Sequence, residues 1–121
     1  MADSNRWRGY SSEEIEALSD WRIFDEELKE RECPHCHRVR LRIYMYRSRD
    51  TGSLATQIWC PHCHSYSGWT GPYPPKLSIS DPLVNLPTEE FADLNRDEDT
   101  LFEHLDALWA DGVLPQQVTR G

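Results

Sequence analysis

A five-residue motif, Cys-Pro-His-Cys-His, occurs twice in this chain, at residues 33–37 and 60–64. Two cysteines separated by two residues can turn back onto one cation, and two such pairs complete a tetrahedral shell of sulfur around zinc. The 23 residues between the two pairs slightly exceed the usual gap of about 15 to 20, but they have room for a strand, a turn and a second strand. We therefore predict one structural Zn²⁺ with four ligands, Cys33, Cys36, Cys60 and Cys63.

Other chemistries use the same motif. Cys-Pro-His-Cys is also typical of thioredoxin-type redox sites, in which the first thiolate lies at a helix N-terminus, whereas a strand pattern follows the motif here. Cys-x-x-Cys-His attaches haem covalently, but this requires export and large haem pockets that a chain with 38% hydrophobic residues does not readily supply. Structural disulfides are disfavoured in a reducing cytoplasm. Four histidines are alternative zinc ligands, although the cysteines already fill the shell: His35, His37, His62 and His64.

A shell of four cysteines has no open position for water or substrate, so the predicted zinc is structural. Four thiolates around Zn²⁺ leave a net negative site, which we expect Arg38 and Arg40 to stabilise. His104 has no nucleophile at a recognisable motif spacing, and the remaining paired carboxylates fit solvated helix surfaces. We therefore predict that the protein is not an enzyme and has no small-molecule substrate.

Residues with alternating polarity follow the first motif. Val39, Leu41, Ile43 and Met45 alternate with arginines and tyrosines, which predicts a half-buried strand. Turn residues within 47–53 and a strand pattern over 54–59 predict a hairpin that brings the two motifs together. Residues 64–70 can form a third strand, and the prolines of residues 73–87 predict a connector without regular structure.

Helix signals lie at both ends of the chain. Ser11 and Glu14 have the spacing of a capping box, but the apolar residues of 12–31 do not share one helix face, so we predict two short helices, the second capped by Ser19 or Asp20. Thr88 is the expected N-cap of the C-terminal helix. Its apolar stripe is strongest over 99–111, where Gly112 marks the end, and the acids at 97–99 indicate a break.

Together these patterns predict an α+β fold in which a small antiparallel zinc-ribbon sheet is flanked by N-terminal and C-terminal helices. The regions are an acidic helical arm (1–32), the zinc ribbon (33–72), the connector (73–87) and an acidic C-terminal helix packed on the ribbon (88–121). We expect all four to form one structural domain, as the 121-residue length suggests. No apolar run approaches the ~20 residues of a membrane span and no signal peptide is recognisable, so we expect a cytoplasmic protein with no membrane partner.

The charge is unevenly distributed along the chain. Residues 1–32 contain ten acids and five bases, residues 33–76 one acid and six bases, and residues 77–121 ten acids and two bases. An acidic surface of this kind can bind a basic protein partner, although a solvated helix face explains the same residues. The candidate partner-binding acids are Glu89, Glu90, Asp93, Asp97, Glu98, Asp99 and Glu103.

Binding of nucleic acid is the alternative function. It would use arginines beside stackable rings on one face of the first predicted strand, and the acidic flanks would weaken it by repelling phosphate. A regulatory adaptor for some other basic protein is a further alternative. The residues of the predicted nucleic-acid face are Arg38, Arg40, Arg42, Tyr44 and Tyr46.

Several short fragments between residues 33 and 115 resemble small bacterial zinc-ribbon immunity proteins of polymorphic toxin systems. These fragments are the two knuckles, with Trp59 before the second, together with Ser-Gly-Trp-Thr-Gly-Pro (67–72), Asp-Pro-Leu (81–83) and Leu-Asp-Ala-Leu-Trp (105–109) leading to Leu-Pro (114–115). The resemblance implies a cytoplasmic antidote that binds a toxin domain and blocks it. It carries over only the four cysteines as metal ligands, and the partner-binding acids come from the charge argument alone.

Overall fold

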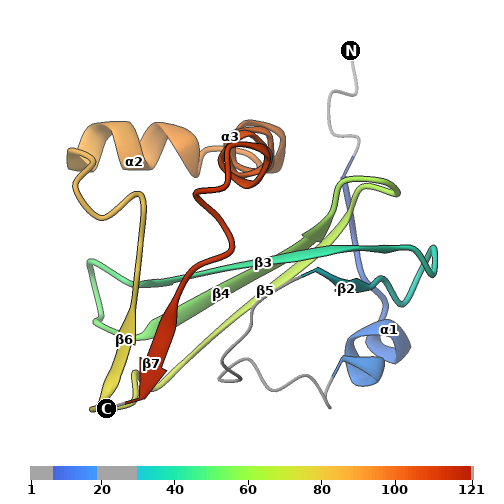
Figure 1. Ribbon diagram of the computed structural model, residues 1–121, viewed down its shortest axis with the longest axis horizontal. Helices are drawn as coiled ribbons and strands as arrows, with labels where there is room; N and C mark the ends of the chain where they lie inside the picture. Colours follow the sequence, from blue (N-terminus) through green and yellow to red (C-terminus); the bar gives the residue numbers. More distant parts are fainter. Residues whose placement is uncertain (1–6, 19–29, 121) are drawn as a thin grey trace.

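The computed structural model of the chain describes residues 7–18 and 30–120. Its largest element is a five-stranded mixed sheet (Figure 1). The strands lie in the order β1 (Arg8–Gly9), β5 (Ser65–Gly71), β4 (Leu54–Cys60), β3 (Val39–Arg47) and β2 (Arg31–Glu32). A second sheet pairs β6 (Leu77–Ile79) with β7 (Val118–Arg120), and the helices are α1 (Ser12–Ala17), α2 (Thr88–Leu94) and α3 (Glu98–Ala110).

The predicted α+β class and the three central strands are confirmed. β3 pairs antiparallel with β4, and β4 pairs antiparallel with β5. The expectation of a purely antiparallel sheet is wrong, because β1 runs parallel to β5. The connector is also not free of regular structure, since it contains β6. The partner of β6 is β7, which lies at the far end of the chain, and such a short, distant pairing has no local sequence pattern.

The middle of β3 is covered on both faces, so the expectation of a half-buried strand is wrong there. On one face Leu41, Ile43 and Met45 are fully buried in a cluster that also includes residues of β4, β6 and β7. On the other face Tyr44 is only 1% exposed and belongs to a second cluster with residues of α3. The helices α2 and α3 lie over this second face (Figure 1), and they exclude the solvent that the alternating pattern had suggested.

Aromatic packing and one carboxylate fix α3 on the sheet. The Trp59 ring of β4 is fully buried and stacks on the Phe102 ring of α3, with centroids 5.2 Å apart. The indole N–H of Trp59 donates a hydrogen bond to Asp106 of α3 at 2.8 Å. Arg42 of β3 donates to the same carboxylate oxygen at 2.8 Å, so one helix residue joins two neighbouring strands.

A glutamine side chain pairs with the outer edge of β3 beyond the end of β2. The Gln116 amide donates to the carbonyl of Met45 at 2.7 Å and accepts from the Met45 N–H at 2.8 Å. Gln116 is only 3% exposed. It therefore satisfies the backbone groups that a further strand would otherwise have to satisfy.

The helix boundaries agree in part with the sequence signals. The predicted capping box of Ser11 and Glu14 is present at the start of α1, whereas the second predicted N-terminal helix, with its caps Ser19 and Asp20, falls on residues 19–29, outside the described residues. The predicted C-terminal break is confirmed, because the region forms α2 and α3 rather than one helix. The prediction of Thr88 as the N-cap of this region is wrong, because Pro87 occupies that position in α2 and makes no side-chain cap hydrogen bond.

The apolar stripe of α3 and its stop signal follow the prediction. Leu101, Phe102 and Leu105 are buried against the sheet. Gly112 follows the helix with a φ of 80°, a left-handed conformation that glycine adopts without steric cost. The region after α3 is not helical, however, since the chain continues into β7 and pairs with β6.

Candidate metal centre

The two Cys-Pro-His-Cys-His motifs form equivalent turns at one end of the sheet. The first joins β2 to β3, and the second joins β4 to β5. In each turn the final histidine has a left-handed backbone, with φ of 63° at His37 and 59° at His64. Its N–H donates to the carbonyl of the first cysteine at 2.9 Å in both cases. The same local conformation is therefore built twice, and the β3–β4–β5 pairing brings the copies together.

The four cysteine sulfurs form one cluster. All four Sγ atoms lie within 4.8 Å of one another. The Sγ atoms of Cys33 and Cys63 are 3.7 Å apart, as are those of Cys36 and Cys60. A tetrahedral shell with Zn–S bonds of ~2.3 Å places its sulfurs about 3.8 Å apart, whereas a disulfide needs about 2.05 Å. The cluster therefore has the dimensions of a metal site and can hold one metal ion, and its cysteines are free.

The centre lies at the boundary between the core and solvent. Cys33 and Cys60, the first cysteine of each motif, are fully buried and belong to the first apolar cluster. Cys36 and Cys63 are partly exposed. A strand rather than a helix follows each motif, so neither motif has the helix N-terminus that lowers the thiol pKa in thioredoxin-type sites.

Hydroxyl groups contact the cysteines from outside the motif. The Tyr10 hydroxyl, in the segment between β1 and α1, lies 3.0 Å from the Sγ of Cys33. The Ser65 hydroxyl at the start of β5 lies 3.3 Å from the Sγ of Cys63. Either hydroxyl can donate to a thiolate that binds metal. The side chains of Arg38 and Arg40 are exposed, and their stabilising effect on the site stays a prediction.

Burial and hydrogen bonding affect the thiol pKa values in opposite directions. Burial raises the pKa of Cys60 and of Cys63. Burial also acts to raise the pKa of Cys33, but the Tyr10 hydroxyl and the N–H groups of Cys36 and His35 outweigh it, so the pKa of Cys33 is lowered. Burial, followed by the contact with Cys33, raises the pKa of Tyr10. Tyr10 therefore keeps its proton and remains a donor at neutral pH.

Carboxylates surround the first motif. Glu14 of α1 accepts hydrogen bonds from the Ser11 N–H at 2.8 Å and from Arg8, and it contacts His35 Nδ1 at 2.7 Å. The backbone hydrogen bond from Ser11 is the main cause that lowers the pKa of Glu14 to about 2. His37 Nδ1 lies 3.1 Å from Glu32. These contacts connect α1 and β2 to the motif, and they occupy one ring nitrogen of each histidine.

The seven candidate partner-binding acids differ in their surroundings. Three of them have intramolecular roles: Asp97 caps α3 by accepting from the Thr100 N–H, Glu98 accepts from the Tyr66 hydroxyl, and Asp99 accepts from the Trp7 indole. The other four are exposed on α2 and α3, namely Glu89, Glu90, Asp93 and Glu103. We call these four residues the acidic helix face.

The five residues of the predicted nucleic-acid face do not form one exposed surface. Arg38 and Arg40 are exposed, but Tyr44 is buried and donates to Asp81 at 2.6 Å. Arg42 has an exposed side-chain fraction of only 14% and forms ion pairs with Glu30 and Asp106 at 2.8 Å. Tyr46 is half-buried and stacks on Tyr44. The prediction of a continuous face is therefore wrong, because α3 and the segment around Asp81 cover its centre.

Comparison of the chain with protein-family models, with curated proteins and with solved structures gives no match. Among residues 7–18 and 30–120, no helix has the length and apolar character that crossing a membrane requires.

Proposed function

We propose that this chain is a zinc-stapled protein-binding module without catalytic activity. The observation that supports it best is the cluster of four cysteine sulfurs within 4.8 Å of one another. A shell of four thiolates saturates a tetrahedral ion, so no position is left to activate water or bind substrate. The metal then stabilises the fold, and the residues on the protein surface carry the function.

Zinc is the metal that suits this donor set. Soft thiolate ligands in a tetrahedral arrangement favour zinc or iron. Zinc is the better choice for a purely structural ion, because it has no redox chemistry. Purified protein should contain one zinc per chain and lack the visible absorbance of an iron–thiolate centre. Iron as the resident metal, or a metal-free protein of unchanged stability, would contradict this assignment.

The acidic helix face is the proposed contact surface. Its four carboxylates project from neighbouring helices, in a region whose net charge is strongly negative: residues 77–121 contain ten acids and two bases. Such a surface steers association with a basic partner and matches its charge. The sequence resemblance to immunity proteins suggests the biological setting, in which the partner is a cognate toxin domain and binding neutralises it.

Charge reversal tests the acidic helix face. The variant Glu89→Lys/Glu90→Lys/Asp93→Lys is expected to weaken binding of a basic toxin domain by at least about tenfold and to reduce the salt dependence of binding. The partner to test is the variable C-terminal domain of any large secreted protein encoded beside this chain's gene, and co-expression with the wild-type chain should relieve the toxicity of that domain. Asp97, Glu98 and Asp99 are left unchanged because their side chains already stabilise the fold.

A matched control carries the same kind of change elsewhere. Glu13 and Glu16 are exposed acids of α1, so Glu13→Lys/Glu16→Lys alters net charge without touching the proposed surface. Protection that survives in the α2 variant, or that is lost equally in the α1 control, would refute the assignment of the contact surface. Absence of a toxin beside the gene, with no protection in co-expression, would refute the immunity role but not the metal site.

A further inference from the structure

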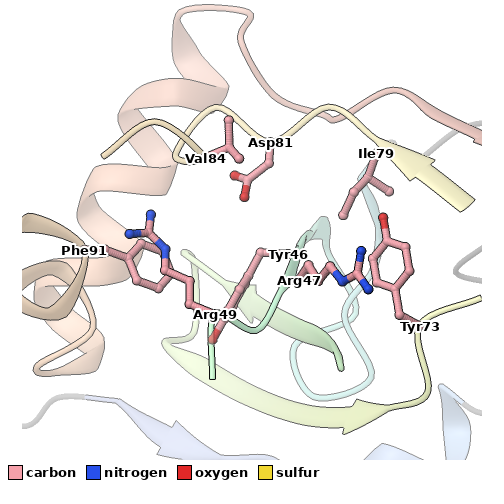
Figure 2. A pocket seen from close by; sticks show the side chains of 8 residues that line it. All are labelled: Tyr46, Arg47, Arg49, Tyr73, Ile79, Asp81, Val84 and Phe91. Carbon is pink, nitrogen blue, oxygen red and sulfur yellow. The ribbon is translucent and has the colours of Figure 1, made fainter. Parts of the chain in front are cut away.

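A cavity of about 490 Å³ lies at the opposite end of β3 from the metal centre. Its walls come from the end of β3 and the turn after it, from the segment that contains β6, and from α2 (Figure 2). Its volume lies within the range of small-molecule sites, about 300 to 1,000 Å³. Neither the metal centre nor the acidic helix face uses the residues that line it.

Two arginines on opposite sides of the cavity lie against aromatic rings (Figure 2). The guanidinium carbon of Arg47 is 4.7 Å from the centre of the Tyr73 ring, and that of Arg49 is 4.3 Å from the centre of the Phe91 ring. Arg49 also donates to the carbonyl of Leu83 at 3.2 Å. Stacking and this hydrogen bond restrict the guanidiniums, so less entropy is lost when their remaining N–H groups bind an anion.

Among the described residues neither arginine forms an ion pair with a carboxylate, although Asp81 lines the same cavity. Arg8 and Arg42 form ion pairs with carboxylates, but within residues 7–18 and 30–120 no such pair involves Arg47 or Arg49. The whole chain has a net charge of −8, so acids to pair with are plentiful. Two positioned but unpaired guanidiniums in one cavity indicate a site for an anionic group.

The remaining walls define the rest of the ligand. Tyr46 lies between the two arginines, and Val84 and Ile79 lie on either side of Asp81 along the opposite wall (Figure 2). The Asp81 carboxylate points into the cavity. One of its oxygens accepts from the Tyr44 hydroxyl at 2.6 Å and the Leu83 N–H at 2.9 Å, which holds the group in place. Its other oxygen is positioned to accept a hydrogen bond from a ligand.

We propose that this cavity binds a small organic phosphate that carries a planar ring, of the nucleoside monophosphate class. The guanidiniums supply the positive charge that attracts the phosphate, the aromatic and apolar walls contact the ring, and Asp81 accepts from an amino or hydroxyl group of the ligand. A lone inorganic anion would leave the aromatic and apolar walls unused. A neutral nucleoside would make no use of the positive charge of either guanidinium.

Titration of the zinc-loaded full chain with AMP, GMP, CMP and UMP, followed by NMR of the arginine Nε–H groups and by calorimetry, tests the proposal. At least one nucleotide is expected to bind at least about tenfold more tightly than adenosine, ribose 5-phosphate or inorganic phosphate. Arg49→Gln and Arg47→Gln should each weaken binding about tenfold, because a charge-assisted hydrogen bond is lost. Arg49→Lys, which keeps the charge but not the fork, should weaken it less than Arg49→Gln.

The matched control is Arg40→Gln, an exposed arginine near the other end of β3, which should bind like the wild type. Metal content and circular dichroism establish that each variant is folded. No response to any nucleotide at about 1 mM, or unchanged affinity in both glutamine variants of the cavity, overturns the site. Equal affinity for ribose 5-phosphate overturns the ring requirement, and an equal loss in Arg40→Gln overturns the role of the cavity. These results are independent of toxin protection.

Discussion

Tyr10 contributes a hydroxyl group to the metal centre from a position 23 residues before its partner Cys33. In Tyr10→Phe the ring still fills the core, but the Cys33 thiolate loses a donor. We expect metal affinity to fall about 10- to 100-fold, the usual effect of losing such an outer hydrogen bond, with little change in fold. Competition with a chelator measures the loss. Tyr73→Phe, which removes a hydroxyl bound to the carbonyl of Leu77, is the control and should retain metal normally.

Thr56 has a buried hydroxyl oxygen with no hydrogen-bond partner among the described residues. The residue lies in the middle of β4 and is 1% exposed. Thr56→Val replaces the hydroxyl with a methyl group of similar shape and retains β-branching, so we expect stabilisation of about 1 kcal/mol in denaturant unfolding. Thr70→Val on β5, where the side chain is exposed, should change stability by less than about 0.5 kcal/mol. Destabilisation of Thr56→Val would instead indicate a partner for the hydroxyl.

At the scale of single elements, the edge of β3 depends on one side chain. Gln116→Ala would leave the N–H and carbonyl of Met45 buried without partners, at a cost of about 2 to 4 kcal/mol in unfolding free energy. Hydrogen exchange at the Met45 amide should accelerate more than exchange elsewhere in β3. Gln117→Ala changes an exposed neighbour and should have little effect on either measurement. Unchanged Met45 exchange in Gln116→Ala would show that another group can cover the edge.

Elements with a local pattern could be predicted from the sequence, and elements that depend on distant contacts could not. Each Cys-x-x-Cys pair and each step of the alternation along β3 spans only a few residues. The cysteine pairs led to the correct prediction of the cysteine cluster, and the alternation led to the correct prediction of a strand. Tyr10, Asp106 and Gln116 act across separations of 23, 64 and 71 residues. The burial of the second face of β3 could not be predicted for the same reason. Arginine and tyrosine at alternate positions are typical of a solvent-exposed face, and only the distant helix α3 covers them.

For the whole molecule, we expect the metal centre and the first apolar cluster to unfold as one cooperative unit, because Cys33 and Cys60 belong to both. Removal of metal by a chelator is expected to lower stability by about 4 kcal/mol or more if zinc is held at 1,000 times its dissociation constant beforehand. Tryptophan fluorescence, to which Trp59 beside Cys60 contributes, should change in the same transition, and added zinc should reverse the change. Cys36→Ser should not respond to zinc in this way. Equal melting temperatures with and without metal would contradict a structural role.

The double coverage of β3 has a consequence for how freely the sequence can vary. A strand with one solvent-exposed face tolerates substitutions at every second position. In β3, by contrast, substitutions at each consecutive position from Leu41 to Met45 should destabilise the fold. The outer part of β5, where Trp69 and Thr70 are exposed, should accept most replacements. A library of all single substitutions, selected for folded protein, would therefore record an unbroken conserved block in β3. New binding surfaces are easier to evolve on the helices and on β5 than on the strand that joins the two cores.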